Sequence, residues 1–190
     1  MNTRIYNVRI LTMEAGKSIF RGEVWVKGDT IAYVGPSVLD AKEKWDREID
    51  GQGNLLMPGF KNAHTHSAMT FLRSHADDMK LDEWLHNRVF PAEAKLCEED
   101  IYWLNKLAIM EYLTSGITSV FDMYLSKPAT LRTVVDTGYR MVICESINDL
   151  EGQSAKWKTT IKDIIRTRTR LISYQLGFHA EYTTGRPLME

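Results

Sequence analysis

Two histidines separated by one residue, His64 and His66, are the strongest candidates for chemistry in this sequence of 190 residues. They follow an apolar run at residues 55–60, which indicates a strand. Because side chains alternate between the two faces of a strand, both imidazoles would face the same way and could bind one metal ion. A catalytic zinc ion normally has three protein ligands and a water. The pair therefore supplies only part of a metal site.

The elements before this pair are predicted strands. Alternation and β-branched content indicate strands at residues 4–11, 22–27 and 30–34. The residues between the second and third of these, Lys27-Gly28-Asp29, fit a tight hairpin turn. We therefore expect a small antiparallel sheet in this region, with a domain boundary near residue 57.

From about residue 58 the pattern changes to alternating strands and helices, which predicts parallel βα units. The clearest helix has the acidic residues 98–100 in its first turn and ends before Gly116. The other predicted elements are strands at 117–122, 140–145 and 171–179 and helices at 128–137 and 154–166. A complete α/β barrel takes about 250 residues, so residues 58–190 suffice for about four βα units.

Composition excludes several classes of partner. The sequence is 44% hydrophobic, and 24 basic and 25 acidic residues give a net charge of -1, which favours neither nucleic acid nor an anionic membrane surface. No stretch approaches the roughly 18 apolar residues of a membrane span, and the first residues lack the apolar run of a signal peptide. We expect a cytoplasmic protein in which Cys97 and Cys144 are reduced core thiols.

The segment at residues 57–73, MPGFKNAHTHSAMTFLR, resembles the first-strand signature of the amidohydrolase superfamily. The resemblance continues at residues 81–85, 89–93, 116–124 and 177–182 and points to the branch of S-adenosylhomocysteine and methylthioadenosine deaminases, guanine deaminase-like enzymes and triazine hydrolases. It implies the N-terminal portion of such an enzyme. The implied fold is α/β, with part of a small antiparallel β-sandwich at 1–57 and the first half of a (β/α)8 TIM-type barrel at 58–190.

The resemblance also implies roles for individual residues. His64 and His66 would be the first two ligands of one divalent metal ion, usually zinc and sometimes iron. His179 would contact the substrate, Glu93 would hydrogen-bond to it, and Trp84 would line the same pocket. A third histidine, an aspartate and a proton-shuttling glutamate lie on later strands in that family. The chain alone is therefore expected to be inactive.

Several of these residues also have a plainer interpretation. At a strand end His179 could be a structural histidine, Glu93 could be a charge near a helix N-terminus, and Trp84 could be core packing. A structural role is favoured for Asp122, and a surface or capping role for His75 and His86.

Charged residues near the third and fourth predicted strands bear on the ligand. Arg166, Arg168 and Arg170 are expected to form a solvated cluster. Nucleoside deaminases of this branch tend to carry an arginine near the end of the third strand, where this sequence has Glu145. A carboxylate there would disfavour anionic groups, so that adenosyl substrates are not favoured by this residue.

The leading hypothesis is a metal-dependent hydrolase that removes ammonia, or chloride, from a nitrogen heterocycle. The rival is a catalytically dead fragment that acts as an oligomerisation or binding module. In either case, unpaired strand edges and an uncovered apolar interior predict a homo-oligomer or association with the missing C-terminal portion.

Overall fold

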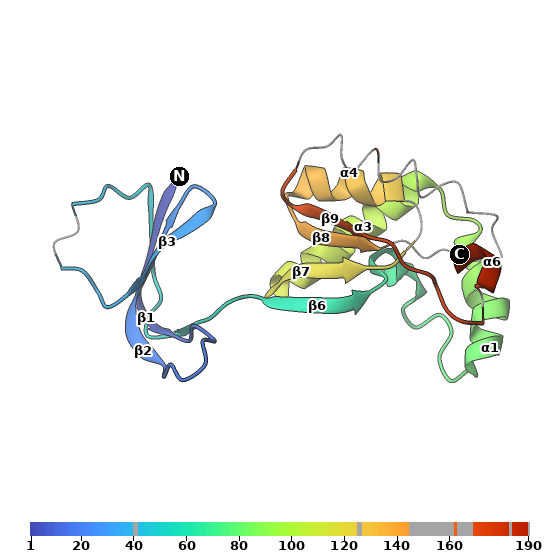
Figure 1. Cartoon of the computed structure of the whole chain (residues 1–190), viewed down its shortest axis with the longest axis horizontal. Helices are drawn as coiled ribbons and strands as arrows, with labels where there is room; N and C mark the ends of the chain where they lie inside the picture. Colours follow the sequence, from blue (N-terminus) through green and yellow to red (C-terminus); the bar gives the residue numbers. More distant parts are fainter. Residues whose placement is uncertain (40–41, 125–126, 145–161, 163–168, 183, 190) are drawn as a thin grey trace. The chain divides into compact units, whose positions relative to one another are not determined.

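The computed structural model describes residues 1–39, 42–124, 127–144, 162, 169–182 and 184–189 (Figure 1). The chain divides into two compact units, Met1–Pro58 and Gly59–Glu190. Each unit has its own sheet and its own apolar core.

The sheet of the first unit has five strands. Strand β1 (Asn2–Ile10) pairs antiparallel with β2 (Phe20–Lys27), which pairs antiparallel with β3 (Thr30–Gly35). These are the three strands that the alternating pattern predicted. The hairpin turn between β2 and β3 is also confirmed, since Gly28 has φ +65° and Lys27 is the partner of Thr30.

The prediction of a purely antiparallel sheet is wrong. Strands β4 (Arg47–Asp50) and β5 (Leu55–Leu56) pair in parallel with β1, so the sheet is mixed. Four and two residues are too few for an alternating pattern to stand out in the sequence. The described part of this unit forms one sheet. The second layer of a β-sandwich therefore stays a prediction.

The second unit is built on a parallel four-stranded sheet in the order β6-β7-β8-β9, as the βα pattern predicted (Figure 1). Its strands are β6 (Phe60–Thr65), β7 (Ile117–Asp122), β8 (Arg140–Cys144) and β9 (Ile172–Gln175). Helix α3 (Glu98–Thr114) connects β6 to β7, and α4 (Lys127–Thr137) connects β7 to β8. Both helices confirm the predicted ones.

Local chemistry explains where α3 begins and ends. Cys97 precedes the helix and forms a capping box with Asp100, whose carboxylate accepts the Cys97 N–H at 2.9 Å. Gly116 follows the helix with φ +74°, a left-handed conformation that favours glycine. Cys97 is consequently exposed, and its prediction as a core thiol is wrong, whereas Cys144 is buried in β8.

The core of the second unit lies between the sheet and its two long helices. Ile109 of α3 and Val134 of α4 pack with buried side chains of three strands, namely Val120, Met141, Ile143 and Ile172. Each of these side chains is at most 9% exposed. Such packing fixes the carboxyl ends of the strands, where the candidate site lies.

Short helical turns that the sequence did not predict precede α3. They are η1 (Ser67–Leu72), α1 (Leu81–Trp84), the π-helical turn η2 (Leu85–Val89) and α2 (Phe90–Glu93); α6 (Arg186–Met189) lies near the C-terminus. The strand predicted at 171–179 is shorter, because β9 ends at Gln175, and β6 ends at Thr65, one residue before His66. The predicted helix at 154–166 lies outside the described residues, except for residue 162.

Candidate functional site at the carboxyl edge of the parallel sheet

The candidate site lies where the parallel strands β6 and β7 end. Thr65, the last residue of β6, is the register partner of Asp122, the last residue of β7. Carboxyl ends of parallel strands meet at one edge, so the residues that follow them converge there. His64 is the penultimate residue of β6 and His66 the first residue after it.

The two histidine rings are neighbours. Their centroids lie 5.1 Å apart with an interplanar angle of 79°. His64 is exposed and His66 is half-buried. The expectation that both belong to one strand is wrong, because His66 lies one residue beyond β6 with φ -127° and ψ 80°. The rings are nevertheless brought together at the sheet edge.

A backbone carbonyl determines which nitrogen of His66 carries the hydrogen. Nδ1 of His66 lies 2.6 Å from the carbonyl oxygen of Met123. A carbonyl can only accept, so Nδ1 is the donor, and the lone pair of the neutral ring is left on Nε2. Histidines that bind metals commonly donate their other N–H in this manner. The donor chemistry of His66 therefore fits a divalent metal ion.

Asp122 is buried beside this pair. It is 2% exposed, and both carboxylate oxygens accept the N–H of Ser67, at 3.3 and 3.4 Å. The bond ties the end of β7 to the residue that follows His66. This contact with the backbone is of the structural kind that the sequence favoured for Asp122.

A network of hydroxyl groups, which the sequence did not reveal, contacts the histidine segment, residues 64–67. Tyr112 of α3 places its hydroxyl 2.7 Å from Thr65 Oγ1 and 3.0 Å from Ser67 Oγ. The Met123 N–H donates to the Thr65 carbonyl at 3.0 Å. The residues on both sides of His66 are thus bonded to α3 and to the chain after β7.

Tyr124 links Glu93 to the histidine pair, and the sequence did not single it out. Its ring lies 6.3 Å from the ring of His66, centroid to centroid, and the residue is 6% exposed. Burial raises the pKa of Tyr124 well above its ordinary value, and the charges of Glu93 and Asp122 act in the same direction. The half-buried Glu93 therefore belongs to this edge of the sheet.

His179 lies near enough to His66 for the two imidazoles to interact electrostatically. It follows Phe178 after β9, and its ring lies 6.0 Å from that of Tyr182. The residue is exposed overall, but partial burial of the ring lowers its pKa, and the nearby His66 lowers it further. Both effects favour a neutral imidazole. The sequence predicted His179 at the end of a strand, but the residue lies in the segment after β9.

Trp84 is the predicted site residue that the structure does not bring to the pair. It is the half-buried last residue of α1, and no ring contact in the described part of the chain joins it to either histidine. Of the other histidines, His86 lies on a helical turn beside Asp82, which agrees with a capping role. Glu145, Arg166 and Arg168 lie outside the described residues.

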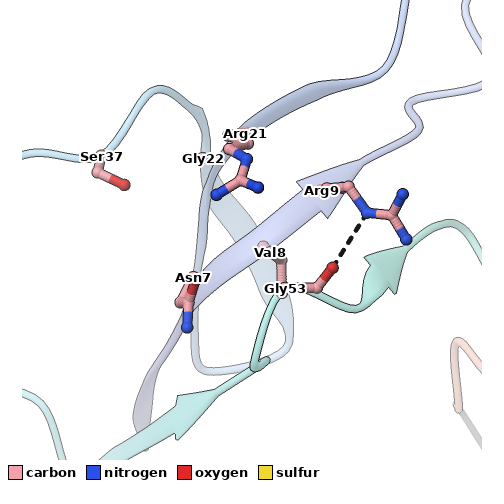
Figure 2. Close-up of a pocket in the computed structure, with 7 residues that line it drawn as sticks. All are labelled: Asn7, Val8, Arg9, Arg21, Gly22, Ser37 and Gly53. Atoms are coloured by element: carbon pink, nitrogen blue, oxygen red, sulfur yellow. Dashed lines mark hydrogen bonds between the residues drawn. The ribbon is translucent and has the colours of Figure 1, made fainter.

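Three further findings concern the described residues. In the described residues no three His, Cys, Asp or Glu side chains are placed to hold one metal ion together. A pocket of about 190 Å³ lies in the first unit, where Arg9 Nε donates to the Gly53 carbonyl at 3.0 Å. Figure 2 shows the residues that line it. It includes none of the residues predicted to bind metal or substrate. Among the helices in the described residues, none has the length and apolarity to cross a membrane.

Comparison with known sequences gives a family match. Residues 55–190 match the model of the amidohydrolase family. The chain is 44% identical over 189 residues to a 5-methylthioadenosine/S-adenosylhomocysteine deaminase of Pelotomaculum thermopropionicum, covering 96% of this chain and 43% of that protein. It is 33% identical to the protein of the same name from Caldicellulosiruptor saccharolyticus, covering 100% of this chain and 45% of that protein. The chain thus spans less than half the length of these relatives.

Comparison with solved structures gives the same fold. An adenosine deaminase from Xanthomonas campestris with bound zinc matches with a TM-score of 0.87 and 28% identity, over 98% of this chain and 44% of that one. An atrazine chlorohydrolase from Arthrobacter aurescens, complexed with zinc, matches with a TM-score of 0.83 over 99% of this chain and 49% of that one. At 19% identity the second likeness concerns the fold alone. The predicted fold class, a partial α/β barrel after a small strand-rich unit, is confirmed.

Proposed function

Because this chain belongs to the amidohydrolase family, we propose that it forms the N-terminal part of a metal-dependent hydrolase that deaminates, or dechlorinates, a nitrogen heterocycle. Residues 1–57 would be part of a small β-sandwich, and residues 58–190 the first half of the hydrolase barrel. The observation that carries the proposal is the histidine pair, in which His66 donates through Nδ1 to a carbonyl and keeps Nε2 for a metal ion.

His64 and His66 would hold one divalent ion, with zinc favoured over iron because a similar adenosine deaminase was crystallised with zinc. When bound, such an ion lowers the pKa of its water toward neutrality and so supplies a nucleophile at physiological pH. The remaining ligands and the proton-shuttling acid would come from outside these 190 residues. We therefore propose that the chain by itself does not turn over substrate.

The other predicted residues would act on the substrate. A neutral His179 can accept or donate a hydrogen bond as charge develops on the ring, and its lowered pKa favours that form. Glu93, whose charge acts on the buried Tyr124, would orient the heterocycle by accepting from its donors. Trp84 would line the pocket once substrate is bound.

Sequence identity of 44% to a 5-methylthioadenosine/S-adenosylhomocysteine deaminase supports a purine nucleoside as the first substrate to test. The carboxylate of Glu145, predicted to disfavour anionic groups, favours a neutral or cationic substituent instead. A substrate panel should therefore include neutral nucleosides, free purines and chlorinated triazines.

The test uses a polypeptide that continues past Glu190 along its own reading frame. Release of ammonia or chloride is measured over this panel, with and without a chelator. We expect metal-dependent hydrolysis that His64→Ala abolishes and His75→Ala, at an exposed histidine outside the pair, leaves intact. Absence of metal-dependent hydrolysis over the whole panel would favour the rival, a catalytically dead binding module.

We also propose that the chain associates with a second copy or with the remainder of the enzyme. The side chains of Trp103 and Met110 on α3 are 58% and 64% exposed, and Leu107 lies between them at helical spacing. Exposed apolar stripes of this kind mark contact surfaces. Light scattering at micromolar concentration would contradict self-association if it gave the monomer mass.

The cytoplasmic location expected from the sequence stays a prediction.

A further inference from the structure

Tyr112 is bonded to both residues that flank His66. Its hydroxyl lies 2.7 Å from Thr65 Oγ1 and 3.0 Å from Ser67 Oγ. Ser67 is 1% exposed, so its hydroxyl is shielded from water that could replace this partner. A tyrosine hydroxyl has one hydrogen and two lone pairs, which is enough to serve both neighbours at once.

Tyr112 is itself held firmly. It lies near the end of the 17-residue helix α3, and its ring stacks on that of Tyr139 with centroids 6.0 Å apart and an interplanar angle of 25°. The hydroxyl of Tyr139 donates to the carbonyl of Ile117 at 2.8 Å. The core of the unit therefore holds the ring of Tyr112 independently of the hydrogen bonds that its hydroxyl makes to Thr65 and Ser67.

The segment around His66 needs such support. His66 follows the end of β6 and has a backbone conformation of neither a regular strand nor a helix, with φ -127° and ψ 80°. The end of β7 and the residue after it hold this segment on one side, through the Ser67 N–H on Asp122 and the Met123 N–H on the Thr65 carbonyl. Tyr112 holds the side chains of Thr65 and Ser67 from α3.

We propose that Tyr112 is a positioning residue for His66. By fixing Thr65 and Ser67, it keeps the ring of His66 in line with the Met123 carbonyl, and so keeps Nε2 directed to the metal position that it shares with His64. The inference rests on the proposed function, because the metal ion belongs to that proposal. Outer contacts that orient metal-binding histidines contribute to metal affinity although they touch no metal.

The alternative is that Tyr112 only fills space in the core. In that case the ring alone matters, and Tyr112→Phe would change stability without changing the histidines. Tyr139→Phe is the matched control, because it also removes one buried tyrosine hydroxyl from the same stacked pair, but that hydroxyl bonds Ile117 and not the histidine segment.

The test measures Co²⁺ affinity and the tautomer of His66 in the 190-residue chain. Co²⁺ alone is titrated into wild type, Tyr112→Phe and Tyr139→Phe, and nitrogen-15 NMR of the histidine rings is recorded without metal. We expect Tyr112→Phe to weaken Co²⁺ binding roughly tenfold, the lower end of the loss for outer contacts of metal-binding histidines. We also expect His66 to shift from the Nδ1-protonated form to a mixture, while Tyr139→Phe changes neither. Thermal denaturation shows that each variant is folded.

The outcomes separate the two proposals. Equal Co²⁺ affinity and an unchanged His66 tautomer in Tyr112→Phe would overturn the positioning role. If wild type bound no Co²⁺, or bound it equally well as His64→Ala, the proposed metal site would fail instead. The tautomer of His66, which is measured without metal, would then decide the role of Tyr112 by itself.

Discussion

Each unit of this protein buries a carboxylate, and the two carboxylates have different surroundings. Glu23 of the first unit is 0% exposed and accepts hydrogen bonds from two nitrogens of Arg4, at 3.1 and 2.6 Å, and from Trp25 Nε1 at 2.8 Å. Asp122 of the second unit is 2% exposed and accepts the backbone N–H of Ser67, next to His66. A buried carboxylate alone therefore does not identify a functional site, whereas the residues around it do.

Removal of Glu23 should have the largest effect on stability. Glu23→Ala removes the partner of the Trp25 N–H and the nearer carboxylate partner of Arg4, which keeps Glu48 at 3.3 Å. The loss should cost about 3 kcal/mol, at the low end for a broken buried pair because Arg4 is partly exposed and keeps this second partner. Urea denaturation and amide hydrogen exchange of β1 and β2 measure the loss. Metal affinity should not change. A large loss of metal affinity in a folded Glu23→Ala variant would contradict the contrast between the two carboxylates.

Removal of Asp122 should have a smaller effect on stability and a clear effect on metal binding. Asp122→Ala leaves the buried Ser67 N–H without these acceptor oxygens, at a cost of about 2 kcal/mol. Since Ser67 adjoins His66, zinc affinity should fall as well. Asp122→Asn keeps an acceptor oxygen and serves as the control, with most of both properties retained. Unchanged zinc affinity in Asp122→Ala, by calorimetric titration, would show that Asp122 does not support metal binding.

The smallest expected effect on stability comes from removing an exposed carboxylate, that of Glu111. The Arg73 guanidinium lowers the pKa of the exposed Glu111 below its ordinary value. The folded protein therefore gains stability from this pair above the ordinary carboxylate pKa and loses it as the pH falls through the lowered one. The stability difference between wild type and Glu111→Gln should shrink from about pH 7 to about pH 3, and with added salt. A stability difference that grows as the pH falls would show that the interaction has the opposite sign.

Periodicity predicted the parts of the fold in which local pattern and tertiary packing agree. In α3 the apolar spacing, the acidic first turn and Gly116 all indicated one helix, and the helix is there. Strands β4 and β5 were missed because they have only four and two residues. Their pairing with β1 depends on partners more than 40 residues away, which no local pattern reports.

The candidate site was predictable only as far as its residues are neighbours in sequence. His64 and His66 are two residues apart, and the structure brings their rings together. Tyr112 is 47 residues from Thr65, and nothing in its own surroundings in α3 distinguishes it from a core tyrosine. Tyr124 follows Asp122 in a segment that did resemble the family, so that resemblance was the one available signal for it. Trp84 resembled a pocket residue, yet among the described residues no ring contact joins it to the pair.

Metal binding by His64 and His66 is the central claim, and zinc titration of the 190-residue chain tests it most directly. Calorimetry gives the affinity, and ring NMR identifies the nitrogens that respond. The account predicts one Zn²⁺ per chain, with shifts at His66 Nε2 and the His64 ring, and at least tenfold weaker binding in His64→Ala and His66→Ala than in the exposed control His86→Ala. Equal affinity in all variants, or shifts confined to His75 and His86, would contradict it.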